Sequence, residues 1–230
     1  MKTKFLVGTS GWSYDWNEGR TLDWYVSNSG LNAVELNSSF YRFPFPNQVK
    51  GWAKRSGLSW SIKVNRSITH MYKFSEKAVP MFEKFEGLFK PMDNVIDNYL
   101  FQLPPSVEGN KAEVVLDFIA RSGLSDRAVV EPRAASWFND EIYSRFKERG
   151  VTMCSIDSPI GSFFAKTTHK IYLRLHGRKS WYTYKYSNKE LRSIINTILN
   201  YNPKEAFIFF NNDHDMLKNA RELLRIIESI

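Results

Sequence analysis

Four acidic or basic side chains lie at the ends of short apolar runs, where they could exchange protons with a bound ligand. Such groups act as general acids or bases when burial moves their pKa values toward neutrality. We therefore predict them as catalytic candidates, with structural salt bridges inside the core as the alternative. The four are Glu35, Lys63, Glu131 and Asp157, which belong to or directly follow the runs 33–36, 60–64, 128–130 and 151–156.

A larger set of polar and aromatic residues occurs at the same run ends and could bind a ligand. Arginine forks hold phosphate or carboxylate groups in bidentate fashion. Aromatic rings stack on bases or sugars, although they also pack between loops and a core. The predicted ligand-binding residues are Ser10, Trp12, Tyr14, Asn37, Ser38, Tyr41, Asn65, Arg66, His70, Gln102, Arg133, Arg174, His176, Asn211 and Asn212.

Several familiar sites are missing from the sequence. It has four histidines and no Cys-x-x-Cys pair, which argues against a histidine-rich or cysteine-rich zinc cluster. It has neither a P-loop nor a Gly-x-Gly-x-x-Gly pattern after a strand. We therefore predict no metal and no cofactor.

The bulk composition favours a cytoplasmic protein with an anionic partner. The 230 residues carry a net charge of +8, which suits nucleic acids or phosphorylated metabolites, although a basic surface also serves solubility alone. Cys154 is the single cysteine, so internal disulfides are excluded and a reducing compartment fits. No apolar run is long enough for a membrane span, and the glycines at 8 and 11 interrupt the first run too early for a signal peptide. Oligomeric state is left open.

The elements that must position these residues alternate between strand and helix. Most of the apolar runs are continuous, which is typical of strands buried on both faces of a parallel sheet. Eight units of about 29 residues predict a (β/α)8 TIM-like barrel in a single domain, 1–230, with an open doubly wound sheet as the alternative. The predicted strands are 5–7, 33–36, 60–64, 99–103, 128–130, 151–156, 171–175 and 206–210.

Five helices are predicted between these strands, and a loop or a very short helix is expected in the sixth unit. The segment 157–170 shows no helical pattern, so we expect the barrel to be irregular there. In either parallel architecture the ligand face lies at the carboxyl ends of the strands, where the polar residues gather. The predicted helices are 76–90, 111–121, 140–149, one that begins with a capping box at Ser187, and 214–227.

Seven segments together resemble the motifs of the DUF72 family, also called YecE-like. The resemblance implies a TIM-barrel-like fold without an established activity. The family's barrel is similar to that of endonuclease IV, which is the basis for proposals of nucleic-acid binding. The segments are GTSGWSY at 8–14, VELNSSFY at 34–41, KVNRSITH at 63–70, FQLPP at 101–105, EPR at 131–133 with Ser136 and Trp137, YLRLHG at 172–177 and FNN at 210–212.

This sequence departs from the family pattern in two places. Ala134 stands where the family usually has a histidine, and the segment after Trp16 is short. The histidine-rich metal set of an endonuclease IV is also absent. The first functional hypothesis is therefore a pocket for a phosphorylated or other anionic compound, which as an enzyme would be a hydrolase or lyase. The alternative is nucleic-acid binding by the same basic face, and a third is a scaffold whose former active site only stabilises the fold.

Overall fold

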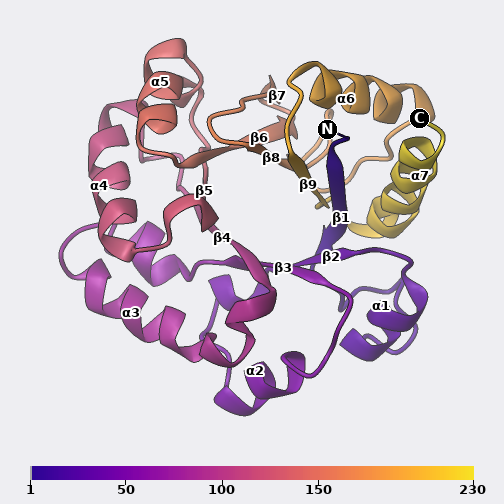
Figure 1. Cartoon of the computed structure of the whole chain (residues 1–230), viewed down its shortest axis with the longest axis horizontal. Helices are drawn as coiled ribbons and strands as arrows, with labels where there is room; N and C mark the ends of the chain where they lie inside the picture. The colour runs from indigo at the N-terminus through magenta and orange to yellow at the C-terminus, as the bar shows by residue number, and fades with distance from the viewer. Residues whose placement is uncertain (1) are drawn as a thin grey trace.

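A closed barrel of eight parallel strands forms the centre of the computed structural model, which describes residues 2–230 (Figure 1). Each barrel strand pairs with the next, and β9 pairs with β1 to close the ring. The predicted barrel is confirmed, and the closure excludes an open sheet. The barrel strands are β1 Lys4–Ser10, β2 Ala33–Leu36, β3 Ser59–Lys63, β4 Ile96–Gln102, β5 Ala128–Glu131, β6 Thr152–Ser158, β8 Lys170–Leu175 and β9 Glu205–Phe210.

Alternation along the strands divides the core into two layers. A cluster of residues drawn entirely from barrel strands, including Leu6, Leu100, Cys154 and Phe209, fills the interior. Their strand neighbours, such as Val7, belong to the larger cluster that contains the apolar helix faces. Because successive side chains point to opposite faces of a strand, the phase of each strand decides which polar residues reach the interior.

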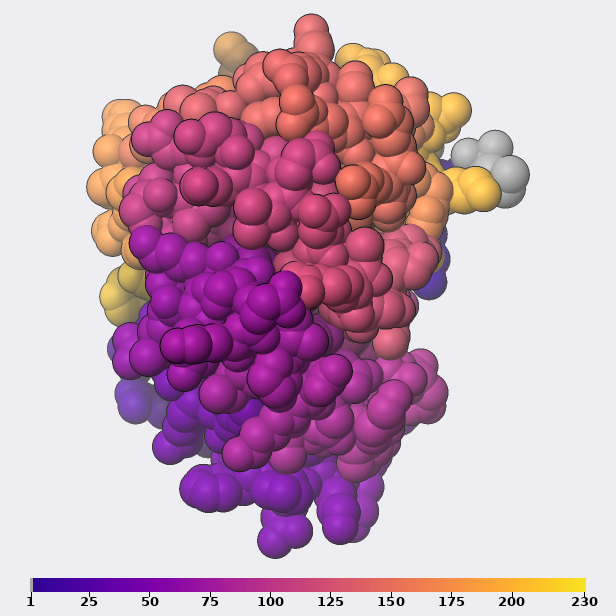
Figure 2. Space-filling view, turned by 90° about the vertical axis from the view of Figure 1, so that its left-hand side faces the viewer, coloured from indigo at the N-terminus to yellow at the C-terminus, as the bar shows by residue number. Residues whose placement is uncertain are grey.

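Helices surround the barrel on the outside (Figure 1). Five of them confirm the predicted helices, whereas α1 and α2 were not predicted, since each has seven residues and little apolar periodicity. On the side of α3, α4 and α5 the side chains form one continuous surface (Figure 2). The helices are α1 Leu22–Asn28, α2 Pro46–Trp52, α3 Ala78–Leu88, α4 Ala112–Ser122, α5 Asp140–Glu148, α6 Asn188–Asn200 and α7 Met216–Glu228.

The sixth unit has a short antiparallel strand in place of a helix, which confirms the predicted irregularity. Strand β7, Gly161–Phe163, turns back on β6 and pairs with Ile156 to Ser158. Gly161 permits the tight reversal because its φ is +140°. No helix within residues 2–230 combines the length and apolar character needed to cross a bilayer.

Candidate functional site

The strand register brings five polar side chains together at the carboxyl end of the barrel interior. Ser10 on β1 lies opposite Glu35 on β2, and Gln102 on β4 lies opposite Glu131 on β5. Arg174 on β8 is in phase with the interior residue Tyr172 and reaches the same level. Because these parallel strands end at one level, their last inward side chains meet at one end of the barrel interior.

Arg174 links the two carboxylates of this cluster. Its Nη2 lies 2.6 Å from Glu35 Oε1 and its Nη1 lies 2.7 Å from Glu131 Oε2, and all three side chains are fully buried. Nη2 also donates to Ser10 Oγ at 3.0 Å. Burial alone would lower the pKa of Arg174, but the charges of Glu131 and Glu35 raise it well above its ordinary value. The guanidinium therefore stays charged and fixes both carboxylates in place.

Glu35 accepts hydrogen bonds from three different side chains. Ser10 Oγ donates to Oε1 at 2.7 Å, beside the bond from Arg174, and Tyr172 OH donates to Oε2 at 2.8 Å. The Tyr172 hydroxyl in turn lies 2.6 Å from Ser61 Oγ. Three donors hold this carboxylate in one orientation. Tyr172 and Ser61 were missed in the sequence, although each lies two positions before a predicted residue and so shares its phase.

Glu131 is bound by several side chains and is held as an anion. Besides Arg174, its partners are Gln102 Nε2 at 2.9 Å and His176 Nε2 at 2.7 Å. Burial raises the pKa of Glu131, but the charges of Arg133 and Arg174 oppose it and bring the pKa well below the ordinary value. Glu131 therefore has no proton to donate near neutral pH, and we expect it to bind and orient other groups.

His176 is an uncharged partner of Glu131. Burial lowers the pKa of His176 to about 3, despite the opposing charge of Glu131. Its Nδ1 lies 3.3 Å from Asn211 Nδ2, which can only donate. We assign the proton to Nε2, which then donates to Glu131 Oε1.

Among the described residues, Lys63 and Arg133 are the cations of the site that donate no hydrogen bond to either glutamate, whereas Arg174 has one unpartnered donor, its buried Nε. Lys63 is 5% exposed, and its Nζ lies 4.2 Å from the centre of the Phe40 ring. Burial and the charges of Arg174 and Arg133 lower the pKa of Lys63 to about 7, against the pull of the two glutamates. Arg133 places its guanidinium carbon 4.7 Å from the ring centre of Trp181. Its Nη2 is 3.1 Å from Glu131 Oε1, but without hydrogen-bond geometry, and its buried Nε and Nη2 have no hydrogen-bond partner among the described residues.

His70 lies at the edge of this cationic group. Its ring packs edge-on against Phe40 with the centroids 5.0 Å apart, and its Nδ1 is 2.8 Å from Thr69 Oγ1. Burial and the nearby charges of Lys63 and Arg133 lower the pKa of His70 to about 4. At neutral pH the positive charge on this side therefore comes from Lys63 and Arg133.

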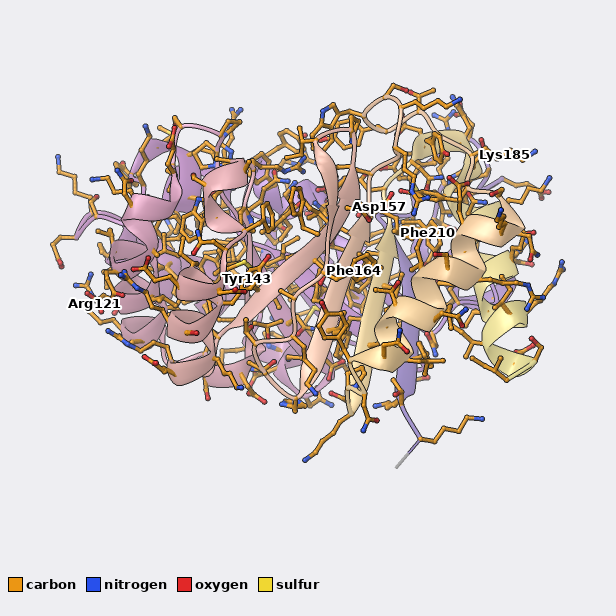
Figure 3. The ribbon with its side chains drawn as sticks, turned by 90° about the horizontal axis from the view of Figure 1, so that it is seen from above. Arg121, Tyr143, Asp157, Phe164, Lys185 and Phe210 are labelled. Carbon is orange, nitrogen blue, oxygen red and sulfur yellow. The ribbon has the colours of Figure 1, made fainter. Side chains whose placement is uncertain are left out.

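Asp157 lies outside the cluster because it occupies an outward-facing position of β6. Cys154 and Ile156 point into the barrel, so Asp157 points away from the interior. There it accepts hydrogen bonds from Arg178 at 2.9 and 3.0 Å, from Tyr186 at 2.8 Å and from Ser162 at 2.7 Å. These contacts hold the loop that follows β8. Figure 3 shows Asp157 at the same end of the barrel as Phe210, with Lys185 of this loop on the rim.

Comparison with known proteins identifies the family. The family model described as "Protein of unknown function DUF72" matches residues 6–229. The chain belongs to the DUF72 family. A DUF72 protein from Thermotoga maritima is 25% identical, with a TM-score of 0.84 over 98% of this chain and 99% of that one. A DUF72 protein from Enterococcus faecalis is 19% identical, with a TM-score of 0.83 over 97% and 95% of the two chains.

A more distant likeness concerns the fold alone. The 3-keto-D-glucoside 4-epimerase from E. coli covers 100% of both chains with a TM-score of 0.55 at 11% identity. No curated protein matches the chain significantly. The family and the barrel are therefore established, while the chemistry of this DUF72 protein has to be argued from its own side chains.

The other predicted site residues of this DUF72 protein have local roles or lie at the surface. Tyr14 OH donates to the Ser10 carbonyl at 3.0 Å, and Trp12 packs edge-on against Trp60. Asn65 and Asn212 bind backbone and side-chain groups of neighbouring turns. Asn37 is half-buried, and its Oδ1 has no partner within residues 2–230. The exposed members of the set are Ser38, Tyr41 and Arg66.

No metal site is evident in the part of the chain that the structure describes. Among residues 2–230, no group of three or more histidine, cysteine, aspartate or glutamate side chains is placed to hold a metal ion. Both glutamates of the cluster instead bind Arg174. Ala134, at the position where the family usually has a histidine, packs against the main core.

Proposed function

We propose that this DUF72 protein binds a small metabolite with a phosphate or carboxylate group at Lys63 and Arg133. The observation that carries the proposal is the set of unused donors on these two side chains, since Arg133 Nε and Nη2 are buried without a partner in residues 2–230. Buried donors that lack acceptors are costly, and a ligand anion would supply the acceptors. Arginine binds such anions through two parallel hydrogen bonds.

The charge balance of the site supports the same ligand class. The site places three cations, Arg174, Arg133 and Lys63, beside the two carboxylates, so its net charge is at most +1 and is carried by Lys63 in its protonated form. Positive charge at a buried position attracts anions because the low-dielectric surroundings screen it little. The Trp181 ring beside Arg133 offers an apolar surface for the rest of the ligand.

For catalysis, the structure favours Lys63 as the acid–base group and a lyase over a hydrolase. With a pKa near 7, Lys63 can take up or release a proton at neutral pH, as a lyase requires. Hydrolysis through a serine is less well supported, because the Ser10 hydroxyl already donates to Glu35 and accepts from Arg174. Glu35 and Glu131 would orient the ligand and stabilise positive charge on it.

A thermal-shift screen with inorganic phosphate, sugar phosphates and short carboxylic acids tests the proposal. A ligand at 100 times its Kd should raise the free energy of unfolding by about 2.7 kcal/mol. Arg133→Gln should lose this shift. Arg66→Gln is the matched control, since Arg66 also follows a strand end but is exposed. A broad panel that shifts neither wild type nor control, or shifts Arg133→Gln equally, would reject the proposal.

Nucleic acid is the second candidate partner, because the rim loop carries the exposed residues Lys179 and Lys185, of which Figure 3 labels Lys185. Such binding should weaken steeply with salt and should depend on these lysines more than on Arg133. Fluorescence anisotropy with single- and double-stranded oligonucleotides at low salt separates the candidates. Binding lost in Lys179→Gln/Lys185→Gln but kept in Arg133→Gln would favour nucleic acid.

A further inference from the structure

The amine of Lys63 is held in the barrel mouth without a hydrogen bond, unlike the other lysine inside the barrel. Lys170 donates to Asn98 Oδ1 at 2.8 Å, whereas Lys63 Nζ has no hydrogen-bond partner in the described chain and faces the Phe40 ring. We propose that Lys63 forms a Schiff base with the carbonyl carbon of an anionic carbonyl compound, such as a 2-oxo acid or a phosphorylated aldehyde or ketone. This inference rests on the proposed anion site.

The surroundings of Lys63 meet the requirements of a Schiff-base lysine. The amine must be uncharged to attack, and a lysine becomes so when it is desolvated or lies beside other cations. Lys63 is buried and lies near Arg174 and Arg133, whose charges act in that direction. The Phe40 ring lies 4.2 Å from the amine, and no described side chain accepts a hydrogen bond from it.

Arg133 and Lys63 would contact two different groups of one substrate. The unused Nε and Nη2 of Arg133 would bind the carboxylate or phosphate, and Lys63 Nζ would face the neighbouring carbonyl carbon. Lys63 ends β3 and Arg133 follows the end of β5, at the same face of the barrel and with β4 between the two strands. The matching substrate would carry an anionic group and a carbonyl group in the same small molecule.

The covalent step balances without a further reactant. The lone pair of Lys63 Nζ forms a bond to the carbonyl carbon, and a nitrogen proton moves through solvent to the oxygen, which gives a carbinolamine. The C–O bond then breaks, the oxygen leaves as water after taking up a second proton, and a C=N bond remains. The protonated imine carries a positive charge, which the anionic Glu35 and Glu131 would stabilise. Neither carbon nor nitrogen is oxidised or reduced.

Reductive trapping of the full chain tests the inference. The protein is incubated near neutral pH with pyruvate, glyoxylate or pyridoxal phosphate and sodium cyanoborohydride, whose hydride reduces the C=N bond to a stable amine. Peptide mass spectrometry should locate the adduct on Lys63, with labelling at least about tenfold above that of any surface lysine, since those remain protonated. Equal labelling of surface lysines and Lys63 would overturn the inference.

Variants separate this inference from the anion site on which it rests. Lys63→Arg should lose the adduct while retaining stabilisation by phosphate, and Arg133→Gln should lower trapping of anionic carbonyl compounds at least about tenfold, the effect of losing about 1.4 kcal/mol of binding. Phosphate stabilisation without trapping at Lys63 would reject the Schiff base and leave the anion site intact. If neither is observed, both proposals fail. An adduct that forms equally in Arg133→Gln would support the lysine's role and reject the anion site.

Discussion

The two ends of the barrel interior each contain a buried lysine, and the amines of the two lysines differ in their hydrogen bonding. At the amino end, Lys170 is 3% exposed, donates to Asn98 and lies 5.4 Å from the Phe207 ring centre. At the carboxyl end, Lys63 has a similar exposed fraction and a similar ring contact with Phe40, but no hydrogen bond in the described chain. The amine at the amino end therefore has an acceptor within the protein, whereas the amine at the carboxyl end keeps its donors available for a ligand.

The strongest test of this comparison removes the cation that completes the carboxyl end. Arg174→Met should leave Glu35 and Glu131 buried without their shared partner, and should lower the free energy of unfolding by about 3–5 kcal/mol. Urea denaturation measures the loss. If Arg174→Met is as stable as wild type, the carboxylates have other compensation and the interpretation of the cluster is wrong.

Matched replacements of the two lysines should separate stability from binding. Lys170→Met leaves Asn98 Oδ1 without its donor and should cost about 1–3 kcal/mol while anion binding is kept. Lys63→Met loses no hydrogen bond and removes an amine whose pKa burial lowers, so it should not reduce stability near neutral pH, while binding is lost. Urea denaturation and calorimetric titration with phosphate measure the two effects. Equal losses of stability in both variants would contradict the contrast between the ends.

The pH dependence of stability gives a finer measure of Lys63. Folding lowers the pKa of this lysine from 10.5 to about 7, so the unfolded chain binds more protons between these values. The free energy of unfolding of wild type should therefore rise with pH relative to Lys63→Met, by at most about 1.4 kcal/mol per pH unit. Denaturation of both proteins at several pH values within this window measures the difference, and parallel curves would show that Lys63 titrates normally.

The smallest effect is expected outside the barrel interior. Asp157→Asn keeps the side-chain shape but weakens the pairing with Arg178, and should cost about 1 kcal/mol, mainly in the order of the loop that follows β8. Hydrogen exchange should become faster in this loop and stay unchanged in β2 and β5. Faster exchange in those strands would place Asp157 with the central cluster instead.

The barrel and most of the cluster could be predicted from the sequence. Which face of a strand a residue occupies, and which side chains pair, could not. Continuous apolar runs located all eight barrel strands, and polar residues at their ends included Ser10, Glu35, Glu131 and Arg174. Asp157 follows an apolar run just as Glu131 does, but a continuous run does not reveal which residues point inward, and here the phase is opposite. The pairing of Arg174 with both glutamates depends on barrel closure, which joins residues 139 positions apart.

Glu190 lies in α6, and its carboxylate contacts two segments of the chain. Its carboxylate closes the capping box of α6 with Ser187 and also pairs with Arg178 at 3.1 Å, in the loop whose Trp181 covers Arg133. The first turn of α6 and this loop therefore share one anchor, and they should unfold locally as a cooperative unit. We therefore expect access to the carboxyl end of the barrel to depend on fraying of a helix on the outside of the molecule.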